Sequence, residues 1–246
     1  MTASFETRIR IAELNIIIKH RHPATARLCR DYVAVFEEAE ADLTVWATEE
    51  EIAAERASAE EAYSDGYLES VCIYRAICRQ LPSRGALLFH AAVIADGEQG
   101  YGFSAPSGTG KSTHIRLWQE TFGDGITVIN GDKPILRRKA DGWYAYGTPW
   151  CGKEGWHTNR SVRLAGLCFL ERGEVDHIER LPLSETAERA IRQVIIPPSP
   201  VEALETLKLM EQLKKEVPHW KLTCTISQQA AQVARRAMSE TNVYNE

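Results

Sequence analysis

Residues 101–113 of the chain read Tyr-Gly-Phe-Ser-Ala-Pro-Ser-Gly-Thr-Gly-Lys-Ser-Thr. Apolar residues precede a glycine-rich turn, and a segment with helical character follows from Ser112 to about Phe122. This order predicts a strand, a loop and a helix. Such a loop points backbone N–H groups inward, and the helix N-terminus adds partial positive charge beside them. We therefore expect a phosphate-binding loop over Ala105–Ser112.

The residues of this loop have separate expected roles in binding a nucleoside triphosphate. Glycine at 108 and 110 lets the backbone approach phosphates without a Cβ clash. Lys111 is expected to reach the β- and γ-phosphates, and Ser112 to ligate magnesium, so the predicted cofactors are ATP and Mg2+. The usual pattern begins with glycine, where this chain has Ala105. The predicted nucleotide-binding set is Ser107, Gly108, Thr109, Gly110, Lys111, Ser112 and Thr113.

A magnesium-dependent phosphate site also needs an acidic side chain near the end of a neighbouring strand. Asp132 follows the apolar run Ile126–Ile129 and fits that position. We expect it to hold magnesium or to accept the proton of the substrate, although aspartate in an Asn-Gly-Asp turn is also common in loops. His90 precedes Lys111 by 21 positions, in an apolar stretch. It is expected to orient Asp132 or contact the γ-phosphate, and a satisfied core histidine is the alternative.

A predicted loop over Thr148–Asn159 contains Lys153 beside glycine. A lysine there is suited to neutralise charge on a transferred phosphoryl group, and a solvated surface lysine is the alternative. Trp150 lies in the same loop, where aromatic side chains contact substrate or pack. The predicted catalytic residues are thus Asp132, His90, Lys111 and Lys153, and the predicted metal ligands are Ser112 and Asp132.

Hairpin signals surround the loop. Asp96-Gly97 separates two apolar segments, Leu87–Ala95 and Gly100–Ser104, and Asp141-Gly142 separates a second pair. Asp-Gly between apolar segments favours a tight antiparallel turn. Hairpins beside a phosphate loop predict an α/β protein with a mixed, antiparallel-rich sheet and flanking helices.

We expect one domain over residues 1–246, with a catalytic core at 87–170 and a C-terminal helical region at 182–246. The N-terminal segment 1–48 is expected to be β-rich, with strands at Ile9–Lys19, Tyr32–Glu37 and Asp42–Trp46. Capping-box patterns predict helix starts at three places. They begin at Thr48, Ser58 and Ser199.

The overall composition narrows the class of protein. The net charge of -5 argues against a nucleic-acid partner. None of the six cysteines shows the Cys-x-x-Cys spacing of a zinc or redox site. The N-terminus has no apolar signal core, and no apolar run approaches the roughly 18 to 20 residues that span a membrane. We expect a cytoplasmic protein without a membrane or nucleic-acid partner. The sequence does not decide whether the protein forms a homo-oligomer.

These residues resemble the HPr kinase/phosphorylase catalytic domain and its small homologues, which share the phosphoenolpyruvate-carboxykinase-like P-loop fold. Residues 107–112 are similar to the family's Ser-Gly-x-Gly-Lys-Ser pattern. His90 matches the family's histidine at the same offset from the loop lysine, and Asp132 matches the second acid of its paired aspartates. The run Tyr146–Lys153 resembles short bacterial homologues. The resemblance covers Leu87–Leu170 and the flanks loosely. It implies ATP, magnesium and an aspartate base assisted by histidine.

The chain departs from that family at Gly131, which stands where the family has its first acid. No segment matches the family's N-terminal domain, so the HPr carrier protein does not follow as the substrate. We therefore expect an ATP-dependent kinase that phosphorylates a hydroxyl of a small molecule or of a peptide Ser/Thr. The alternative from another class is a nucleotide-binding regulatory protein or weak ATPase without phosphotransfer, which the missing acid favours.

Overall fold

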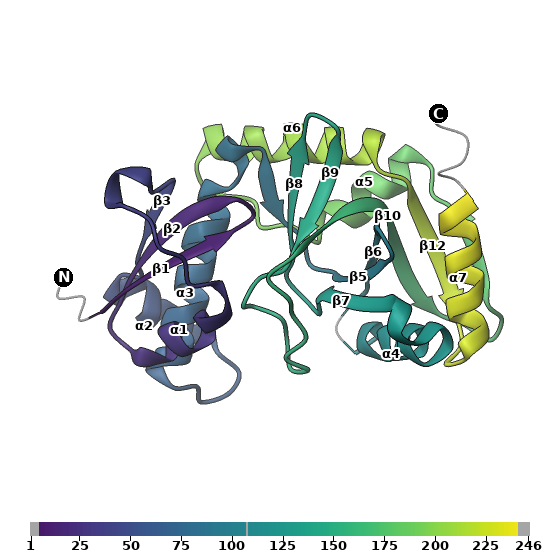
Figure 1. The fold of residues 1–246 in the computed structure, drawn as a ribbon, viewed down its shortest axis with the longest axis horizontal. Coiled ribbons are helices and arrows are strands. Elements are labelled where there is room, and N and C mark those ends of the chain that lie inside the picture. The colour runs from purple at the N-terminus through teal and green to yellow at the C-terminus, as the bar shows by residue number, and fades with distance from the viewer. Residues whose placement is uncertain (1–4, 107, 241–246) are drawn as a thin grey trace.

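The computed structural model describes residues 5–106 and 108–240. Two sheets form within this part of the chain, one small and N-terminal and one large and central (Figure 1). The N-terminal unit, with its sheet and helices, lies at one end of the molecule, and the central sheet with its helices forms the rest. The mixed α/β architecture expected from the sequence is confirmed.

The small sheet has the order β1-β2-β3 over the described residues, with β1 at Phe5–Ile11, β2 at Leu14–His20 and β3 at Leu43–Val45. The single strand expected over Ile9–Lys19 is wrong, because the chain reverses at Ala12 and Glu13. Both residues have positive φ, 52° and 61°. That geometry suits a two-residue hairpin turn, but it usually selects glycine or asparagine.

Helices α1 (Pro23–Leu28), α2 (Glu49–Ser58) and α3 (Asp65–Gln80) complete the N-terminal unit. Apolar side chains of α2 and α3 pack with the small sheet into one core cluster, and α1 lies against α3. The capping box at Thr48 is confirmed, since its hydroxyl accepts the N–H of Glu51. The start predicted at Ser58 is wrong: Ser58 ends α2, and Ser64 caps α3. The strand expected at Tyr32–Glu37 is also wrong, because short 3-10 turns flank an extended stretch there: η1 (Arg30–Tyr32) and η2 (Glu38–Glu40).

The central sheet has nine strands among the described residues. The main path runs β4-β8-β9-β10-β6-β5-β7, and β12 pairs with both β10 and β11. Strand β10 pairs in parallel with β6 and β12, and the remaining pairs are antiparallel. The strands are β4 (Ala86–Leu88), β5 (Ala92–Asp96), β6 (Gln99–Ser104), β7 (Ile126–Asn130), β8 (Ile135–Lys139), β9 (Gly142–Tyr146), β10 (Ser161–Arg172), β11 (His177–Arg180) and β12 (His219–Cys224).

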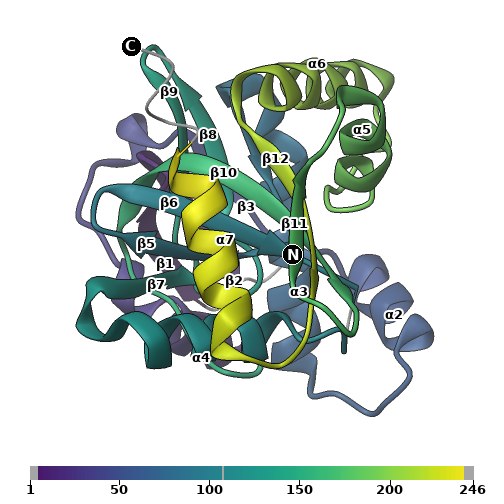
Figure 2. The same cartoon turned by 90° about the vertical axis from the view of Figure 1, so that its right-hand side faces the viewer.

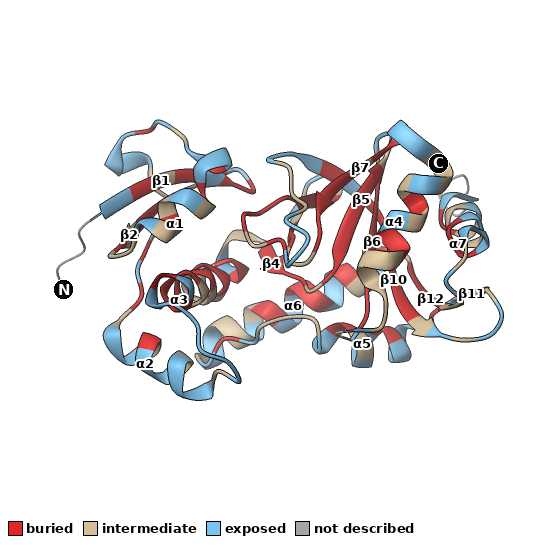
Figure 3. Ribbon diagram, turned by 90° about the horizontal axis from the view of Figure 1, so that it is seen from below, coloured by how far each residue is buried: buried red, intermediate tan, exposed pale blue. Residues whose placement is uncertain are grey.

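Helices cover both faces of the central sheet (Figure 2). Helices α4 (Lys111–Phe122) and α7 (Gln228–Glu240) pack through Trp118 and Met238 on one face. Helices α5 (Leu183–Ile191) and α6 (Pro200–Glu216) pack through Ala190 and Leu213 on the other. The main strands are consequently buried, and the outer helix faces are exposed (Figure 3).

The apolar stretch Leu87–Ala95, expected as one strand, forms two strands with a break over residues 89–91. His90 lies in that break rather than within a strand. Its N–H donates to Gln193 O (2.7 Å), and its carbonyl accepts the Ser104 hydroxyl (2.9 Å). The sheet register then brings three chain segments to one edge. Ala92, at the start of β5, pairs with Phe103 near the end of β6, and Val93 pairs with Asn130 at the end of β7.

In the part of the chain that the structure describes, no helix combines the length and the apolar character needed to cross a bilayer.

The capping of two helices gives a direct test of these assignments. We expect Thr48→Ala to lower the free energy of unfolding by about 1 kcal/mol, because Glu51 N–H loses its acceptor. Ser199 makes no side-chain capping hydrogen bond although its sequence has the same pattern, so Ser199→Ala is the matched control and should change stability by less than about 0.5 kcal/mol. Urea unfolding measures both. Equal losses in the two variants would contradict the assignment.

Candidate functional site

Asp132 is the carboxylate at the shared edge of the sheet, and Asn130 fixes its backbone. The Asn130 side-chain oxygen accepts the N–H groups of Asp132 (2.9 Å) and Lys133 (2.6 Å). The amide nitrogen of Asn130 donates to the Thr148 carbonyl (2.9 Å), and the residue is fully buried. Asparagine closes such local turns readily. The strand end therefore presents Asp132 in a defined direction.

Three basic side chains surround the Asp132 carboxylate. The Lys111 ammonium donates to Oδ1 at 2.9 Å, and His90 Nε2 lies 3.0 Å from the same oxygen. Lys133 donates to Oδ2. The side chain of Asp132 is 21% exposed and that of Lys111 12%. Charged hydrogen bonds of this kind are strong where water is largely excluded.

His90 has two close polar neighbours at one nitrogen, since its Nε2 also lies 2.8 Å from Lys111 Nζ. An ammonium group only donates, so a neutral His90 accepts from Lys111 through Nε2 and carries its proton on Nδ1. A protonated imidazole donates instead to Asp132 and repels Lys111. The hydrogen bonds of the trio therefore depend on the protonation of His90 and on the position of Lys111.

Electrostatics keep Asp132 charged. Burial raises the pKa of Asp132, but the hydrogen bond from His90 and the positive charge of Lys133 and Lys111 outweigh it and hold the pKa well below its usual range. Burial also lowers the pKa of Lys111, and the charge of Asp132 opposes that effect only in part. The site thus holds an ionised carboxylate with cations on both of its oxygens.

The glycine-rich loop lies between β6 and α4. Gly108 and Gly110 have φ of 76° and 121°, values that favour glycine, and nothing lies within 4 Å of a Cβ built on either. Helix α4 starts without a side-chain cap, so the N–H groups of its first turn stay available to a ligand. Arg172 Nε donates to the Thr109 carbonyl (3.2 Å), and its Nη2 donates to the Gly108 carbonyl. Open space beside the free N–H groups suits an anion.

Gly131 is crowded. A Cβ built there lies 2.8 Å from the Cys151 carbonyl oxygen and 3.4 Å from that of Trp156. The backbone of Gly131 donates to the Trp156 carbonyl at 2.8 Å, which holds residues 148–159 against the end of β7. A side chain at 131 is therefore excluded by the backbone of this segment, so the site has room for one carboxylate here and not two.

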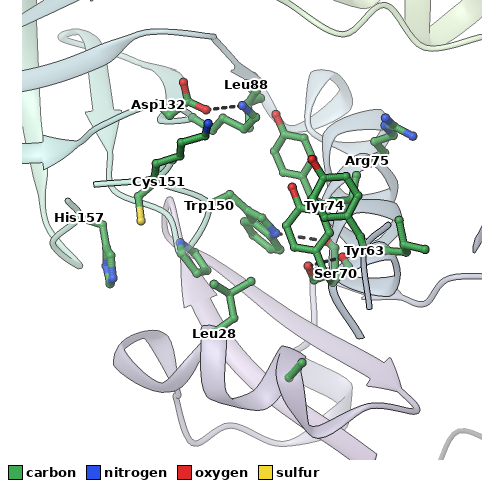
Figure 4. A pocket seen from close by; sticks show the side chains of 18 of the residues that line it. Leu28, Tyr63, Ser70, Tyr74, Arg75, Leu88, Asp132, Trp150, Cys151 and His157 are labelled. Atoms are coloured by element: carbon green, nitrogen blue, oxygen red, sulfur yellow. Dashed lines mark hydrogen bonds and ion pairs between the residues drawn. The ribbon is translucent and has the colours of Figure 1, made fainter. Parts of the chain in front are cut away.

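The Asp132 cluster opens into a cavity of about 1280 Å3. Its walls come from α1, α3 and the loop 148–159, so it lies between the N-terminal unit and the central sheet. Figure 4 shows Asp132 at one side of this cavity, with Trp150 and Tyr74 on the α3 side. Lys153 also lines the cavity, is exposed, and has no hydrogen bond or ion pair among the described residues. The structure thus places Lys153 in the same cavity as Asp132 without bringing the two into contact.

The predicted catalytic residues His90, Lys111 and Asp132 come together although they lie far apart in the sequence. Ser112 and Thr113 follow Lys111 in the first turn of α4, half-buried and without a contact to Asp132. Ser107 lies outside the described residues.

Sequence reasoning missed Asn130, Lys133 and Arg172. For Asn130, the asparagine two residues before the predicted acid was an available signal. Nothing in the sequence separates Lys133 and Arg172 from other surface cations. Lys133 directly follows Asp132 in the sequence, whereas only the long-range pairing of the fold brings Arg172 to the glycine-rich loop.

A metal ion at this site would depend on the nucleotide. Among the described residues, no group of three His, Cys, Asp or Glu side chains is placed to hold a metal. Magnesium is often bound by one or two carboxylates together with substrate phosphates and water. A hydroxyl at Ser112 and one carboxylate at Asp132 are oxygen ligands of the kind that magnesium prefers, so the residues present fit that mode of binding.

No family model matches the chain, and no curated protein matches it in sequence. One solved structure to which it is similar is the Hpr(Ser) kinase/phosphatase from Coxiella burnetii. That likeness has 9% sequence identity and a TM-score of 0.37, and it covers 64% of this chain and 94% of the other. At this level the likeness does not establish a family.

The crowding at Gly131 predicts a stability loss. We expect Gly131→Ala to lower the free energy of unfolding by about 1–3 kcal/mol, because the new Cβ meets the Cys151 carbonyl. Gly125→Ala is the matched control, since that site has open space and no positive φ. Thermal unfolding compares the two. An unchanged midpoint for Gly131→Ala would show that the segment 148–159 is not held against β7.

The lowered pKa of Asp132 predicts how stability depends on pH. A depressed folded pKa stabilises the protein fully above the unfolded pKa of about 3.9, and the contribution is lost as pH falls through the folded value. We expect Asp132→Asn to cost about 1–3 kcal/mol, constant from pH 5 to 8, with the cost shrinking only at about pH 4 and below. Urea unfolding across pH measures this. Asp124→Asn, at an exposed site, is the control. A cost that vanishes already at pH 6 would contradict the assignment.

Proposed function

We propose that this chain is a cytoplasmic ATP-dependent kinase that transfers the γ-phosphoryl group to a hydroxyl. We assign its core to the P-loop fold of the HPr kinase/phosphoenolpyruvate-carboxykinase-like type. The observation that carries the proposal is the contact between Lys111, at the glycine-rich loop, and Asp132, at the end of β7, with His90 against both. The three residues come from separate segments of the chain. The side chains of two of them, Lys111 and Asp132, are both largely buried.

The phosphates of ATP would lie on residues 107–113. Glycines with open space in front of them, an uncapped helix start and a buried lysine support that placement. A γ-phosphate would also compete with Asp132 for Lys111. Because Lys111 bridges His90 and Asp132 here, its movement toward a phosphate would release Oδ1 of Asp132 and Nε2 of His90.

Magnesium would be held by Ser112, Asp132 and the phosphate oxygens. Bound there, it would neutralise charge on the transferred group. Lys111 and Lys133 would add positive charge near the same place, and Lys153 would add more from the loop that faces the cavity.

The acceptor hydroxyl would lose its proton to Asp132, with His90 orienting the carboxylate. A depressed pKa makes Asp132 a weak base. Transfer of a phosphoryl group needs little help from a strong base, since most catalysis comes from position and charge. A weak base that stays ionised at neutral pH is therefore compatible with this role.

The acceptor would be a small molecule or a peptide Ser/Thr. The net charge of -5 gives no reason to add a nucleic-acid partner. The cavity beside Asp132 is the place where an acceptor would reach the γ-phosphate.

A nucleotide-binding regulatory protein or weak ATPase is the second candidate. It is favoured by the crowding at Gly131, which leaves the end of β7 with one acid. Such a protein would bind ATP and magnesium as a kinase does, but it would not phosphorylate any hydroxyl compound. Only an acceptor screen separates the two.

The proposal is tested by calorimetry of ATP binding together with a transfer assay over hydroxyl compounds and serine peptides. Lys111→Ala should weaken ATP binding and lower transfer at least about 100-fold, and Asp132→Asn should lower transfer by a similar factor while ATP still binds. Lys208→Ala, an exposed lysine of α6, is the control and should match the unaltered protein. No heat with ATP and magnesium would refute nucleotide binding, and binding without transfer would favour the second candidate.

A further inference from the structure

The cavity beside Asp132 carries unbalanced positive charge. Its carboxylates are Asp31, Glu55 and Asp132, and each already has a basic partner. Asp31 lies 3.6 Å from Arg30, Glu55 pairs with Arg75, and Asp132 contacts Lys111. Two cations that line the same cavity have no such partner among the described residues.

These two cations are Arg27 and Lys153, which come from opposite walls. Arg27 lies on α1 in the N-terminal unit, and Lys153 lies on the loop 148–159. Both are exposed, and neither forms a hydrogen bond or ion pair with a described residue. Leu28, the neighbour of Arg27, stands across the cavity from Asp132 (Figure 4). Because Arg27 lines the cavity from α1 of the N-terminal unit and Asp132 lines it from the central sheet, a ligand that spans the cavity from Asp132 reaches the wall that carries Arg27.

Aromatic rings form the wall between those two ends. Tyr74 and Trp150 have ring centroids 5.4 Å apart, and Tyr63 and Tyr67 stack at 4.7 Å. Trp150 is held in place because its indole N–H donates to the Ser70 carbonyl at 3.2 Å. Tyr63 and Tyr67 are 43% and 49% exposed, a large apolar area to leave facing a cavity. Such rings bind flat apolar groups well.

We propose that this cavity binds the phosphoryl acceptor, a small hydroxyl compound that carries an anionic group and an aromatic or other apolar body. The hydroxyl lies at Asp132, the body packs along Trp150 and Tyr74, and Arg27 pairs with the anionic group. Lys153 adds positive charge to the cavity from the loop 148–159. The inference rests on the proposed kinase function only in so far as the ligand is called a phosphoryl acceptor. The class of ligand follows from the residues that line the cavity.

A charged pair and an apolar contact can be tested separately with three probes. The probes are 4-(hydroxymethyl)benzoate, its primary amide, and gluconate, in which a polar chain of the same length joins the hydroxymethyl group to the carboxylate. Binding is measured by calorimetry, with and without a non-hydrolysable ATP analogue and magnesium. We expect 4-(hydroxymethyl)benzoate to bind at least about 10-fold more tightly than either of the other two, because the amide cannot pair with Arg27 and the polar chain of gluconate cannot pack on the aromatic wall.

Variants assign the effect to residues. Arg27→Met should remove the preference for 4-(hydroxymethyl)benzoate over its amide, and Trp150→Ala should remove the preference over gluconate. Arg10→Met, an exposed arginine of β1 outside the cavity, is the matched control and should keep both preferences. The methionine side chain keeps most of the apolar stem of arginine, so folding is little affected.

The outcomes separate this inference from the proposed function. Equal binding of 4-(hydroxymethyl)benzoate and its amide, or an unchanged preference in Arg27→Met, overturns the ligand class even if ATP binds. Transfer to serine peptides while none of the three probes binds also overturns it and leaves the kinase function standing. The reverse result, selective binding of 4-(hydroxymethyl)benzoate without ATP binding, supports the cavity assignment and refutes the kinase function.

Discussion

The ion pair between Lys111 and Asp132 is the contact on which the candidate site depends. It joins the start of α4 to the end of β7, and neither residue is near the other in sequence. Both side chains are largely withdrawn from water, where a lone charge is costly and a pair with several hydrogen bonds is tolerated. His90 contacts Oδ1 of the same carboxylate, and Lys133 donates to its Oδ2. The pairing of β5 with both β6 and β7 brings the segments that carry these residues to the same end of the sheet.

Much of this arrangement could be predicted from the sequence where local rules decide structure. The glycine-rich loop, helix α4, both Asp-Gly hairpins and the capping box at Thr48 follow from short patterns whose chemistry acts within a few residues. His90 was expected beside Lys111 because the intervening hairpin returns the chain, and Asp132 was expected there because a magnesium-dependent phosphate site needs an acid at the end of a neighbouring strand.

Tertiary contacts decided the features that could not be predicted. The turn at Ala12 and Glu13 has no glycine, and it is held because Glu13 binds Lys139 (2.9 Å) and Tyr146 (2.9 Å), which lie far away in sequence. The break at His90 likewise depends on a bond to Gln193. The sequence shows that glycine stands at 131, where the resembled family has its first acid. It does not show the reason, which is that the Cys151 carbonyl leaves no room for a side chain there.

The loop 148–159 touches both halves of the molecule. Gly131 N–H binds the Trp156 carbonyl on one side, while the Trp150 indole binds Ser70 of α3 on the other, and Asn159 binds the Asp31 carbonyl at 3.0 Å. This short span of backbone therefore contacts both the N-terminal unit and the end of β7 that carries Asp132. A shift of the small sheet relative to the large one would be transmitted through these bonds to Gly131, the residue next to Asp132, so the span couples the far wall of the cavity to the carboxylate.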